Sequence, residues 1–452
     1  MSATGSAADL VVRRARVATC DDEWSTLDSG GVAVVRGTLV AVAPDEELAT
    51  WIGPSTEVVD AGGGILLPGL VNAHCHAGDV LFRGLVEGLP LEAWLEQVWR
   101  AERATLDEAN TELGATLGYA ECALGGVTTV MDMFWHSEAN LRGARAVGLR
   151  LATGGIFFDG VGMDGIGPQE RPRLAERFLC EHRNDPDVIG CVMPHGAYTV
   201  APEGLRRAAR IARRHDALLS LHAAETRAEQ EIVGERYGRS VVRHLDELGL
   251  LGPRTVLAHG VHLDEVEIDL LAASGATVVH NPVSNLKLAS GVAPVPRLLA
   301  AGVRVALGTD GAISGNDLDL WLALRLAAIL HKGIGGDATA VSSRQALAMA
   351  TRDGAAALGV GHLVGSLEAG KRADLVLLRA DRAHSVPCFD LHDQLVFATG
   401  RGDVDSVWVD GREVVRGGTL RLCELTPLLA AVRGLQPRIA ASIAEHGGTA
   451  AG

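Results

Sequence analysis

Short apolar runs alternate with helix-like patterns through the middle of the chain. Eight of these runs have the length and the β-branched content of buried strands, and they end at or near His74, Asp132, Phe158, His195, His222, His259, His280 and Asp310. The segments between them carry helix signals, such as a proline at the first position of a helix beginning at Pro202 and a capping box at residues 105–108. Strands that alternate with helices form parallel βα units, so the pattern predicts an α/β fold.

Further β patterns flank this region on both sides. Residues 9–66 hold short alternating runs without a helix of useful length between them, and similar runs return at residues 373–378 and 406–415. Within the last run, Asp410–Gly411 between alternating residues is a strong hairpin signal. The two flanking groups predict a single small β-sandwich composed from both chain ends.

Four of the central strands end in side chains that can bind a metal ion. His74 and His76 are two residues apart on one strand, and residues i and i+2 of a strand point to the same face. Both imidazoles can therefore reach one ion from a single strand end. His222, His259 and Asp310 end the other three strands. In a (β/α)8 barrel the functional side chains sit at the carboxyl ends of the strands, so all five are expected at one mouth.

The expected domains follow from these patterns. They are a composite β-sandwich of residues 1–66 and 368–422, a metal-dependent (β/α)8 barrel of residues 67–367, and a C-terminal helix and tail of residues 423–452. The glycine-rich segment Gly154–Gly167 is the least regular part of the barrel region. It is expected in a loop over the mouth, where a substrate lid and a merely mobile loop stay open as alternatives.

Five ordered stretches carry a resemblance to a known family. They are Pro-Gly-Leu-Val-Asn-Ala-His-Cys-His (68–76), His-Ala-Ala-Glu (222–225), the strand ending at His259, His-Asn-Pro-Val-Ser-Asn-Leu-Lys-Leu (280–288) and Leu-Gly-Thr-Asp-Gly (307–311). Together they resemble the amidohydrolase superfamily, and within it the mononuclear-metal aminohydrolases that deaminate adenosine derivatives, guanine and triazines. The resemblance covers nearly the whole chain and implies a TIM-type barrel with the same composite β-sandwich.

A metal site is expected from the residue types and from this resemblance. A mononuclear zinc-type site needs about three nitrogen ligands, a carboxylate and an open position. His74, His76, His222 and Asp310 provide that set. Two-metal members of the superfamily bridge their ions with a lysine or glutamate on the fourth strand, whereas that strand here ends at His195 without a lysine. One divalent ion is therefore expected, zinc first and iron as the alternative.

The resemblance also assigns catalytic roles. Glu225, three residues past a ligand, resembles the general acid/base that moves a proton from the nucleophilic water to a ring nitrogen of the substrate. By the same resemblance His259 hydrogen-bonds that water, and Asp310 accepts its proton. His195 and Glu92 match positions that contact substrate, Glu92 at the ribose. The structural alternatives are a packing role for His195 and a solvated helix face for Glu92.

The implied activity is hydrolytic deamination of an amino-substituted N-heterocycle. An adenosine-type nucleoside such as 5'-methylthioadenosine is the first expectation. The alternatives are a pterin, guanine-type or s-triazine amino- or chlorohydrolase, or an amide or ring hydrolase on the same site.

This chain departs from adenosine-type members at one point. In those members an arginine follows the third strand, and a second lies about a dozen residues later, positioned for ribose or a carboxylate-bearing tail. Here Gly154 stands in place of the first, and the nearest basic residues are Arg171 and Arg173. A compact neutral substrate is therefore expected, either a 5'-modified adenosine with an apolar tail or a free heterocycle, in contact with Phe157 and Phe158.

Composition narrows the setting. The net charge of the 452 residues is -15, only three residues are lysine, and the arginines are scattered, which argues against a nucleic-acid partner. The seven cysteines form no Cys-x-x-Cys pair, and neither a signal peptide nor an apolar run of about 18 residues is visible. These features predict a cytoplasmic enzyme without a membrane partner. A homo-oligomer, dimer or higher, is expected as a general prior.

Overall fold

The structure is a computed structural model in which residues 7–444 are described. These residues form two compact units, one of residues 7–72, 122–129 and 319–422, the other of residues 73–121, 130–318 and 423–444. Among the helices of residues 7–444, none combines the length and the apolar character needed to cross a bilayer.

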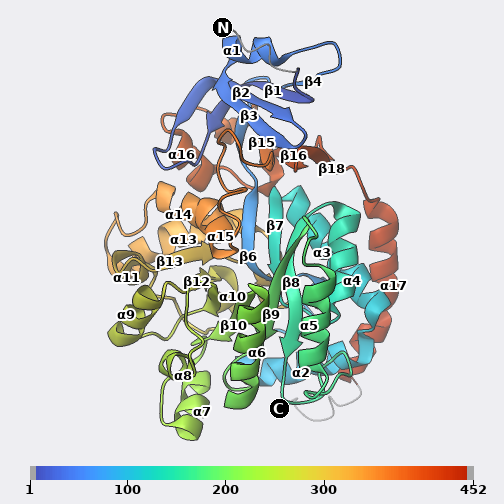
Figure 1. Ribbon diagram of the computed structural model, residues 1–452, viewed down its shortest axis with the longest axis vertical. Coiled ribbons are helices and arrows are strands. Elements are labelled where there is room, and N and C mark those ends of the chain that lie inside the picture. Colours follow the sequence, from blue (N-terminus) through green and yellow to red (C-terminus); the bar gives the residue numbers. More distant parts are fainter. Residues whose placement is uncertain (1–6, 445–452) are drawn as a thin grey trace. The chain divides into compact units, whose positions relative to one another are not determined.

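A closed parallel sheet forms the α/β core (Figure 1). Its order is β13-β12-β11-β10-β9-β8-β7-β6-β14, with bounds β6 Leu70–His76, β7 Val127–Asp132, β8 Arg150–Phe157, β9 Val188–Pro194, β10 Leu218–Ala223, β11 Thr255–His259, β12 Thr277–His280, β13 Arg304–Leu307 and β14 Asp310–Gly311. β13 and β14 lie at opposite ends of this order, yet only Gly308 and Thr309 separate them in the chain, so the sheet closes on itself. Taken together they make the eighth strand, and the predicted (β/α)8 barrel is confirmed.

Helices follow or connect the strands of this sheet. They are α3 Glu108–Leu124, α4 Ser137–Val147, α5 Arg171–Glu181, α6 Pro202–His215, α7 Arg227–Tyr237, α8 Val241–Glu247, α9 Glu265–Ser274, α10 Pro282–Lys287, α11 Val295–Ala300 and α12 Ala312–Gly315. In α6, Leu205, Ala208 and Ala212 recur at helical spacing and are buried, while the arginines between them are exposed. Pro202 opens this helix, as predicted. Figure 1 shows α5 and α6 beside β8 and β9.

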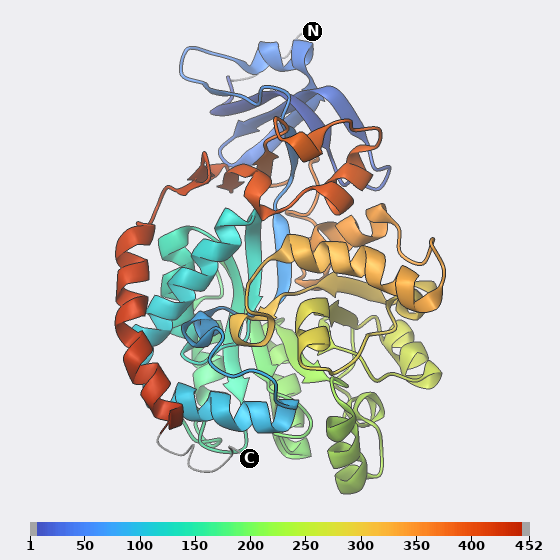
Figure 2. The ribbon, with the colours of Figure 1, turned by 180° about the vertical axis from the view of Figure 1, so that it is seen from behind.

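Helix α2 (Leu91–Thr105) packs against α17 (Leu425–Ala444), as Figure 2 shows. Arg438 Nη2 donates a hydrogen bond to the carbonyl of Ala104 at 2.6 Å. The predicted C-terminal helix is confirmed up to Ala444, and the part predicted beyond it lies outside the described residues.

The capping box predicted at residues 105–108 is wrong in its register. Thr105 is the last residue of α2, and α3 begins at Glu108. The side chain of Asp107 receives the amide of Asn110 at 2.8 Å, so Asp107 serves the start of α3. Asp107, rather than Thr105, is therefore the residue whose side chain caps the start of α3.

A second sheet combines strands from both chain ends. Its order is β18-β17-β16-β15-β5-β1-β2-β3, with β4 beside β1, and the bounds are β1 Leu10–Ala18, β2 Thr26–Val35, β3 Thr38–Pro44, β4 Glu57–Asp60, β5 Ile65–Pro68, β15 Leu375–Leu378, β16 Val404–Val409, β17 Arg412–Arg416 and β18 Thr419–Leu420. β5 joins the two halves, because it pairs in parallel with β1 and antiparallel with β15. The expected composite β structure is confirmed, and its strands form one continuous sheet.

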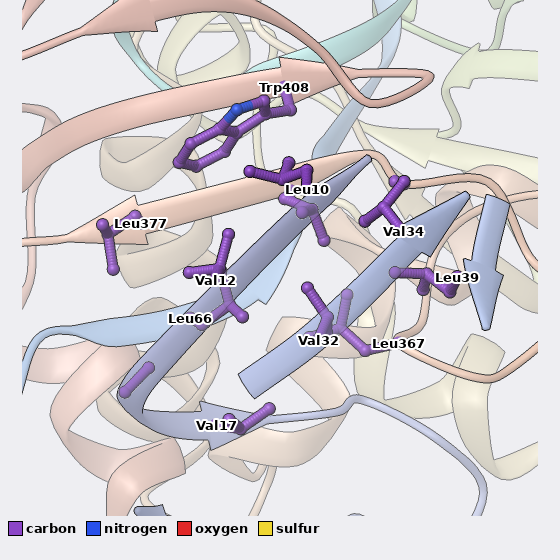
Figure 3. Close-up of a cluster of buried hydrophobic side chains, with 13 residues drawn as sticks. Leu10, Val12, Val17, Val32, Val34, Leu39, Leu66, Leu367, Leu377 and Trp408 are labelled. Carbon is purple, nitrogen blue, oxygen red and sulfur yellow. The ribbon is translucent and has the colours of Figure 1, made fainter. Parts of the chain in front are cut away.

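The core of this sheet is aliphatic around one tryptophan. Leu10, Val12, Val34 and Leu377 are buried together with Trp408, which is 1% exposed (Figure 3). The alternation of these positions along β1, β2 and β15 is the reason that one face is apolar. The hairpin predicted at Asp410–Gly411 connects β16 to β17.

Helices α13 (Leu320–Gly335), α14 (Ser343–Ala350) and α15 (Arg352–Ala357) belong to the same unit as this sheet. The domain boundaries expected from the sequence, at residues 66, 367 and 422, stay predictions.

The glycine-rich segment is more regular at its start than expected. Gly154 and Gly155 belong to β8, where a Cβ at Gly154 would lie 1.9 Å from the carbonyl oxygen of Cys191 on β9. Glycine therefore permits close approach of the two strands at this point. The irregular loop begins only after Phe157.

Candidate metal centre and active-site pocket

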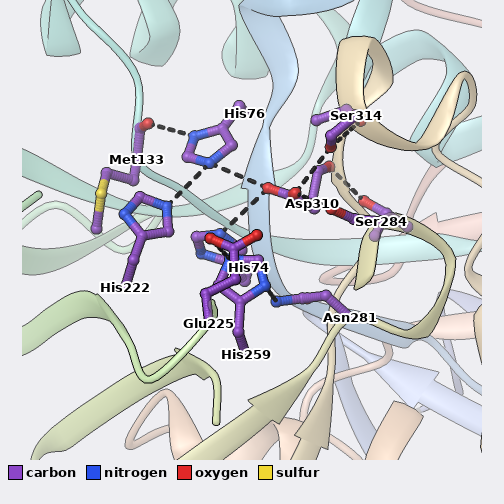
Figure 4. A network of polar contacts seen from close by, with 12 residues as sticks. His74, His76, Met133, His222, Glu225, His259, Asn281, Ser284, Asp310 and Ser314 are labelled. Atoms are coloured by element: carbon purple, nitrogen blue, oxygen red, sulfur yellow. Dashed lines mark hydrogen bonds and ion pairs between the residues drawn. The ribbon is translucent and has the colours of Figure 1, made fainter. Parts of the chain in front are cut away.

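Two histidines of β6 and one aspartate of β14 meet at one end of the barrel. His74 Nε2 and His76 Nε2 lie 3.4 and 3.2 Å from Asp310 Oδ1 (Figure 4). Both rings reach the same oxygen because residues two apart on a strand share a face. Cys75 between them is fully buried.

His222 at the end of β10 completes a compact set of donors. Its Nε2 lies 3.3 Å from His76 Nε2. His76 Nδ1 donates to the carbonyl of Met133 at 2.6 Å, and His222 Nδ1 donates to that of His195 at 2.7 Å. Since a carbonyl only accepts, these bonds fix both tautomers and leave the Nε2 lone pairs facing each other.

Burial and the Asp310 carboxylate act in opposite directions on the charge of these rings. Burial opposes a charge on His76, yet the Asp310 carboxylate outweighs burial and raises the pKa of His76 to about 10. Burial lowers the pKa of His74 to about 4 and that of His222 well below its usual value, so both rings are neutral, as metal ligands must be. His74 Nδ1 is buried without a hydrogen-bond partner, and His74 Nε2 faces Asp310 Oδ1. The residues present therefore fit one divalent ion, and their roles as ligands stay predictions.

Asp310 is held in a single orientation. Its Oδ2 accepts hydrogen bonds from Ser284 Oγ at 2.6 Å and Ser314 Oγ at 2.7 Å, which leaves Oδ1 for the histidine cluster. Although burial opposes ionisation, hydrogen bonds from His74 and His76 hold the pKa of Asp310 well below its usual range. Its φ of 59° is left-handed, a conformation that costs a non-glycine residue about 1–3 kcal/mol and concentrates at functional sites.

His259 ends β11 with a φ of 77°, a second left-handed strand end. Its Nδ1 lies 2.8 Å from Asn285 Oδ1 and 3.4 Å from Asn281 Nδ2. The nearer partner is an amide oxygen, which only accepts, so this contact places the proton on Nδ1 and the lone pair on Nε2. That Nε2 lies 3.6 Å from Glu225 Oε2. His259 also has a ring nitrogen near those of His74 and His222, so coordination is the alternative to its predicted contact with water.

Glu225 follows β10 and is 7% exposed. Its Oε1 accepts a hydrogen bond from Ser290 Oγ at 3.2 Å. Burial raises the pKa of Glu225 above its usual value, although the nearby His259 opposes the shift. A carboxyl group with a raised pKa can both take and return a proton near neutral pH.

His195 directly follows β9 and lies beside the cluster. Its ring centroid is 4.8 Å from that of His222, and its Nδ1 is 2.9 Å from Thr199 Oγ1. Burial lowers the pKa of His195 to about 3, with nearby histidines acting in the same direction. A neutral imidazole at this position can form a hydrogen bond with a heterocycle without transferring a proton to it.

A pocket opens above these groups. Its base holds His76, His195, His222, Glu225, His259 and Asp310, and its apolar wall holds Leu91, Trp94, Val98, Trp99, Phe134, Trp135 and Leu288. Neither arginine nor lysine lines this pocket among the described residues. Phe157 and Phe158 are not in its lining either, and Phe158 packs instead against the rings of Trp99, Trp135 and His195. Tryptophans, rather than these two phenylalanines, therefore line the pocket wall.

Glu102 is a pocket residue that the sequence reasoning missed. It is 5% exposed, lines the pocket from α2 and accepts a hydrogen bond from Trp135 Nε1 at 3.1 Å. Burial raises the pKa of Glu102 to about 7. Its signal was a carboxylate four positions after Val98 on the stripe that Leu91 and Leu95 begin. Glu92 lies on the same helix, but its side chain is outside the described part.

Arg171, the nearest basic candidate for a substrate tail, is engaged elsewhere. It is 4% exposed and pairs with both oxygens of Asp164 at 2.8 and 3.1 Å. It also donates to the carbonyl of Ile166 at 2.9 Å and lies over the ring of Trp135. Arg171 therefore holds the loop after β8 in place, and Arg173 is exposed.

The chain is similar to proteins of known family. The family model described as the amidohydrolase family matches residues 65–414. The chain is 42% identical to a 5-methylthioadenosine/S-adenosylhomocysteine deaminase of Syntrophobacter fumaroxidans, over 95% of this chain and 98% of the relative. It is 38% identical to a 5'-deoxyadenosine deaminase of Methanothermobacter thermautotrophicus, over 88% of this chain and 93% of the relative.

Solved structures agree as well. A zinc-bound adenosine deaminase from Xanthomonas campestris superposes with a TM-score of 0.94 at 35% identity, covering 96% of this chain and 99% of that one. A zinc-bound atrazine chlorohydrolase from Arthrobacter aurescens superposes with a TM-score of 0.86 at 25% identity, covering 95% and 100%. The chain belongs to the amidohydrolase family.

Proposed function

We propose that this protein is a hydrolytic deaminase that releases ammonia from an adenosine-type nucleoside with a small uncharged 5' group, such as 5'-methylthioadenosine. The observation that carries the proposal is the division of the pocket into a histidine–carboxylate base and a tryptophan-rich wall without a cation. The base suits attack of water on an amine-bearing carbon, and the wall suits a flat heterocycle with an apolar tail. The names of the relatives support the adenosine-type substrate.

His74, His76, His222 and Asp310 would hold one divalent ion, zinc first, with iron as the alternative. When bound, such an ion supplies a hydroxide nucleophile near neutral pH by lowering the pKa of water to about 7. The zinc in solved relatives supports this choice.

The protein's own groups move the protons. His259 Nε2, whose lone pair is free of Asn285, accepts a hydrogen bond from the attacking water and aims it at C6 of the purine. Glu225 passes a proton to N1 of the purine, and Asp310 Oδ1 takes the second proton of the water. The C6–N bond then breaks, ammonia leaves with that proton, and a 6-oxopurine remains. His195 orients the ring as a neutral hydrogen-bonding group.

We also infer a role for Glu102 at the ribose, because it lines the pocket from α2 and is not a member of the candidate metal-binding groups. Replacing Glu102 by alanine should raise KM for adenosine about 10-fold, since a lost hydrogen bond of ~1.4 kcal/mol has that effect. KM for 2',3'-dideoxyadenosine, which lacks both hydroxyls, should change little. Glu96→Ala, an exposed carboxylate on the same helix, is the matched control. Equal losses for both nucleosides in Glu102→Ala would contradict the ribose contact.

The metal content is a separate expectation. Purified protein, reconstituted and mildly dialysed, should contain one divalent ion per chain, because the donors form one cluster and no lysine follows β9. Elemental analysis measures the ratio. Two ions per chain, or none after reconstitution, would be incompatible with a mononuclear site.

The function itself is tested by an ammonia-release panel on metal-reconstituted protein. The panel contains adenosine, 5'-deoxyadenosine, 5'-methylthioadenosine, guanine, a pterin and an amino-s-triazine. The highest kcat/KM is expected for a 5'-modified adenosine. Higher efficiency with a free base, a pterin or a triazine would replace the nucleoside proposal by one of those alternatives.

We further infer a cytoplasmic homo-oligomer, dimer or higher. All seven cysteines lie within the described residues and are free thiols, which supports a reducing compartment. Light scattering of the purified protein measures the subunit count.

A further inference from the structure

The turn that carries Glu225 has a strained backbone. Ala224, between the end of β10 and Glu225, has a φ of 54°. An alanine in this left-handed region is unfavourable, because its Cβ approaches the following carbonyl. The turn therefore needs contacts outside itself to keep this shape, and its shape decides where the Glu225 carboxyl points.

One set of contacts comes from the loop after β11. The carbonyl of Ala223 accepts the amide of Gly260 at 3.0 Å, and the carbonyl of Ala224 accepts those of Val261 and His262, each at 2.9 Å. These bonds join the turn to the segment that follows His259. They explain why the side chains of Glu225 and His259 lie close together, and they occupy only the carbonyl side of the turn.

The amide side is held by Glu229. Its Oε2 accepts the backbone amide of Glu225 at 2.8 Å. Glu229 is 3% exposed and is the third residue of α7, whose N-cap Thr226 accepts the amide of Glu229 at 3.1 Å. In an ordinary capping box the carboxylate at this helix position bonds the N-cap amide. Here it bonds the residue before the N-cap, which is Glu225.

We propose that Glu229 is a positioning residue that holds the turn so that the carboxyl of Glu225 faces the substrate. The inference rests on the proposed function of Glu225 as the proton carrier. Glu229 does not line the pocket and does not touch the histidine cluster. Its hydrogen bond to the proposed reaction centre is the one to the backbone amide of Glu225.

The bond needs an acceptor oxygen rather than a negative charge. Burial raises the pKa of Glu229 to about 8, although the amides of Glu225 and Ala224 oppose the shift. The group is therefore largely neutral at pH 7, and its carbonyl oxygen still accepts. Glutamine keeps such an oxygen at the same distance from the backbone, whereas alanine removes it.

The experiment compares single and double variants in the ammonia-release assay. Glu229→Ala should lower kcat about 10- to 100-fold with little change in KM, the size expected for displacement of a catalytic group by about 1 Å. Glu229→Gln should stay within about threefold of the parent protein. Glu231→Ala, an exposed carboxylate on the same helix, is the matched control for helix stability. Metal content and Tm are measured for every variant.

A double variant separates positioning from a general structural role. If Glu229 acts through Glu225, adding Glu229→Ala to Glu225→Gln should lower kcat no further than Glu225→Gln alone. The same 10- to 100-fold loss in the Glu225→Gln background would overturn the inference, as would a parent-like kcat in Glu229→Ala. A loss in Glu229→Gln equal to that in Glu229→Ala would also overturn it. Absence of ammonia release by the parent protein would instead reject the proposed function.

Discussion

Replacing Glu225 by glutamine is expected to lower kcat by about 10² to 10⁴ while metal content stays at the parent value. The amide has nearly the same shape as the carboxyl, so the pocket keeps its form. It cannot take up and release a proton, however, and the proposed reaction needs this transfer to N1 of the purine. The hydrogen bond from Ser290 Oγ survives in the variant, because the amide oxygen accepts it as well.

The comparison variant is His222→Ala, which removes a nitrogen from the cluster. It should lose both metal and activity, whereas Glu225→Gln should lose activity alone. Elemental analysis and ammonia release, measured on the same preparations, distinguish the two cases. Near-parent kcat in Glu225→Gln would mean that another group carries the proton, and loss of its metal would mean that Glu225 is a ligand.

S-adenosylhomocysteine is expected to be a poorer substrate than 5'-methylthioadenosine, with a kcat/KM lower by about 10- to 150-fold. This range corresponds to the roughly 1.5–3 kcal/mol that a charge-assisted hydrogen bond contributes. The carboxylate of S-adenosylhomocysteine would enter a pocket without arginine or lysine in its lining. Arg171 cannot serve it without leaving Asp164 and the carbonyl of Ile166.

Both substrates contain the same adenosine group, so the ratio of their kcat/KM values measures the effect of the 5' tail alone. The names of several relatives include both compounds, which makes the ratio informative. Arg171→Lys is unsuitable as a control because it would disturb the loop after β8; Arg173→Ala, at an exposed position, tests the remaining candidate. Equal or better efficiency with S-adenosylhomocysteine would show that a cation reaches the tail from outside the pocket lining.

The barrel and the metal-competent cluster, which consists of His74, His76, His222 and Asp310, could be predicted from the sequence. Both depend on patterns among residues that are close together in the chain. A strand period of two places His74 and His76 on one face, and a polar residue at the end of a buried run marks the mouth of a barrel. His222 and Asp310 were found by the same rule. No long-range geometry was needed beyond the closure of the sheet.

Other features depended on contacts that a one-dimensional pattern does not contain. In the sequence, Glu102 is one of several acidic residues on an amphipathic helix. Only the packing of α2 shows that its side chain faces the pocket. Thr105 and Asp107 are both good caps, and only the path of the chain between α2 and α3 selects the aspartate. The start of the irregular loop was placed too early, at Gly154, because that glycine allows close approach to Cys191 within the strand.

Helix α2 supplies Leu91, Trp94, Val98, Trp99 and Glu102 to the pocket, and it carries no member of the metal-competent cluster. The part of the pocket wall that α2 supplies is therefore encoded apart from the residues of the metal-competent cluster. Substitutions along 15 consecutive residues can reshape the wall while the proton-transfer groups on the strand ends remain as they are. Among descendants of such a protein, changes of substrate should accumulate in this helix, and a library confined to it is a direct route to new nucleoside preferences.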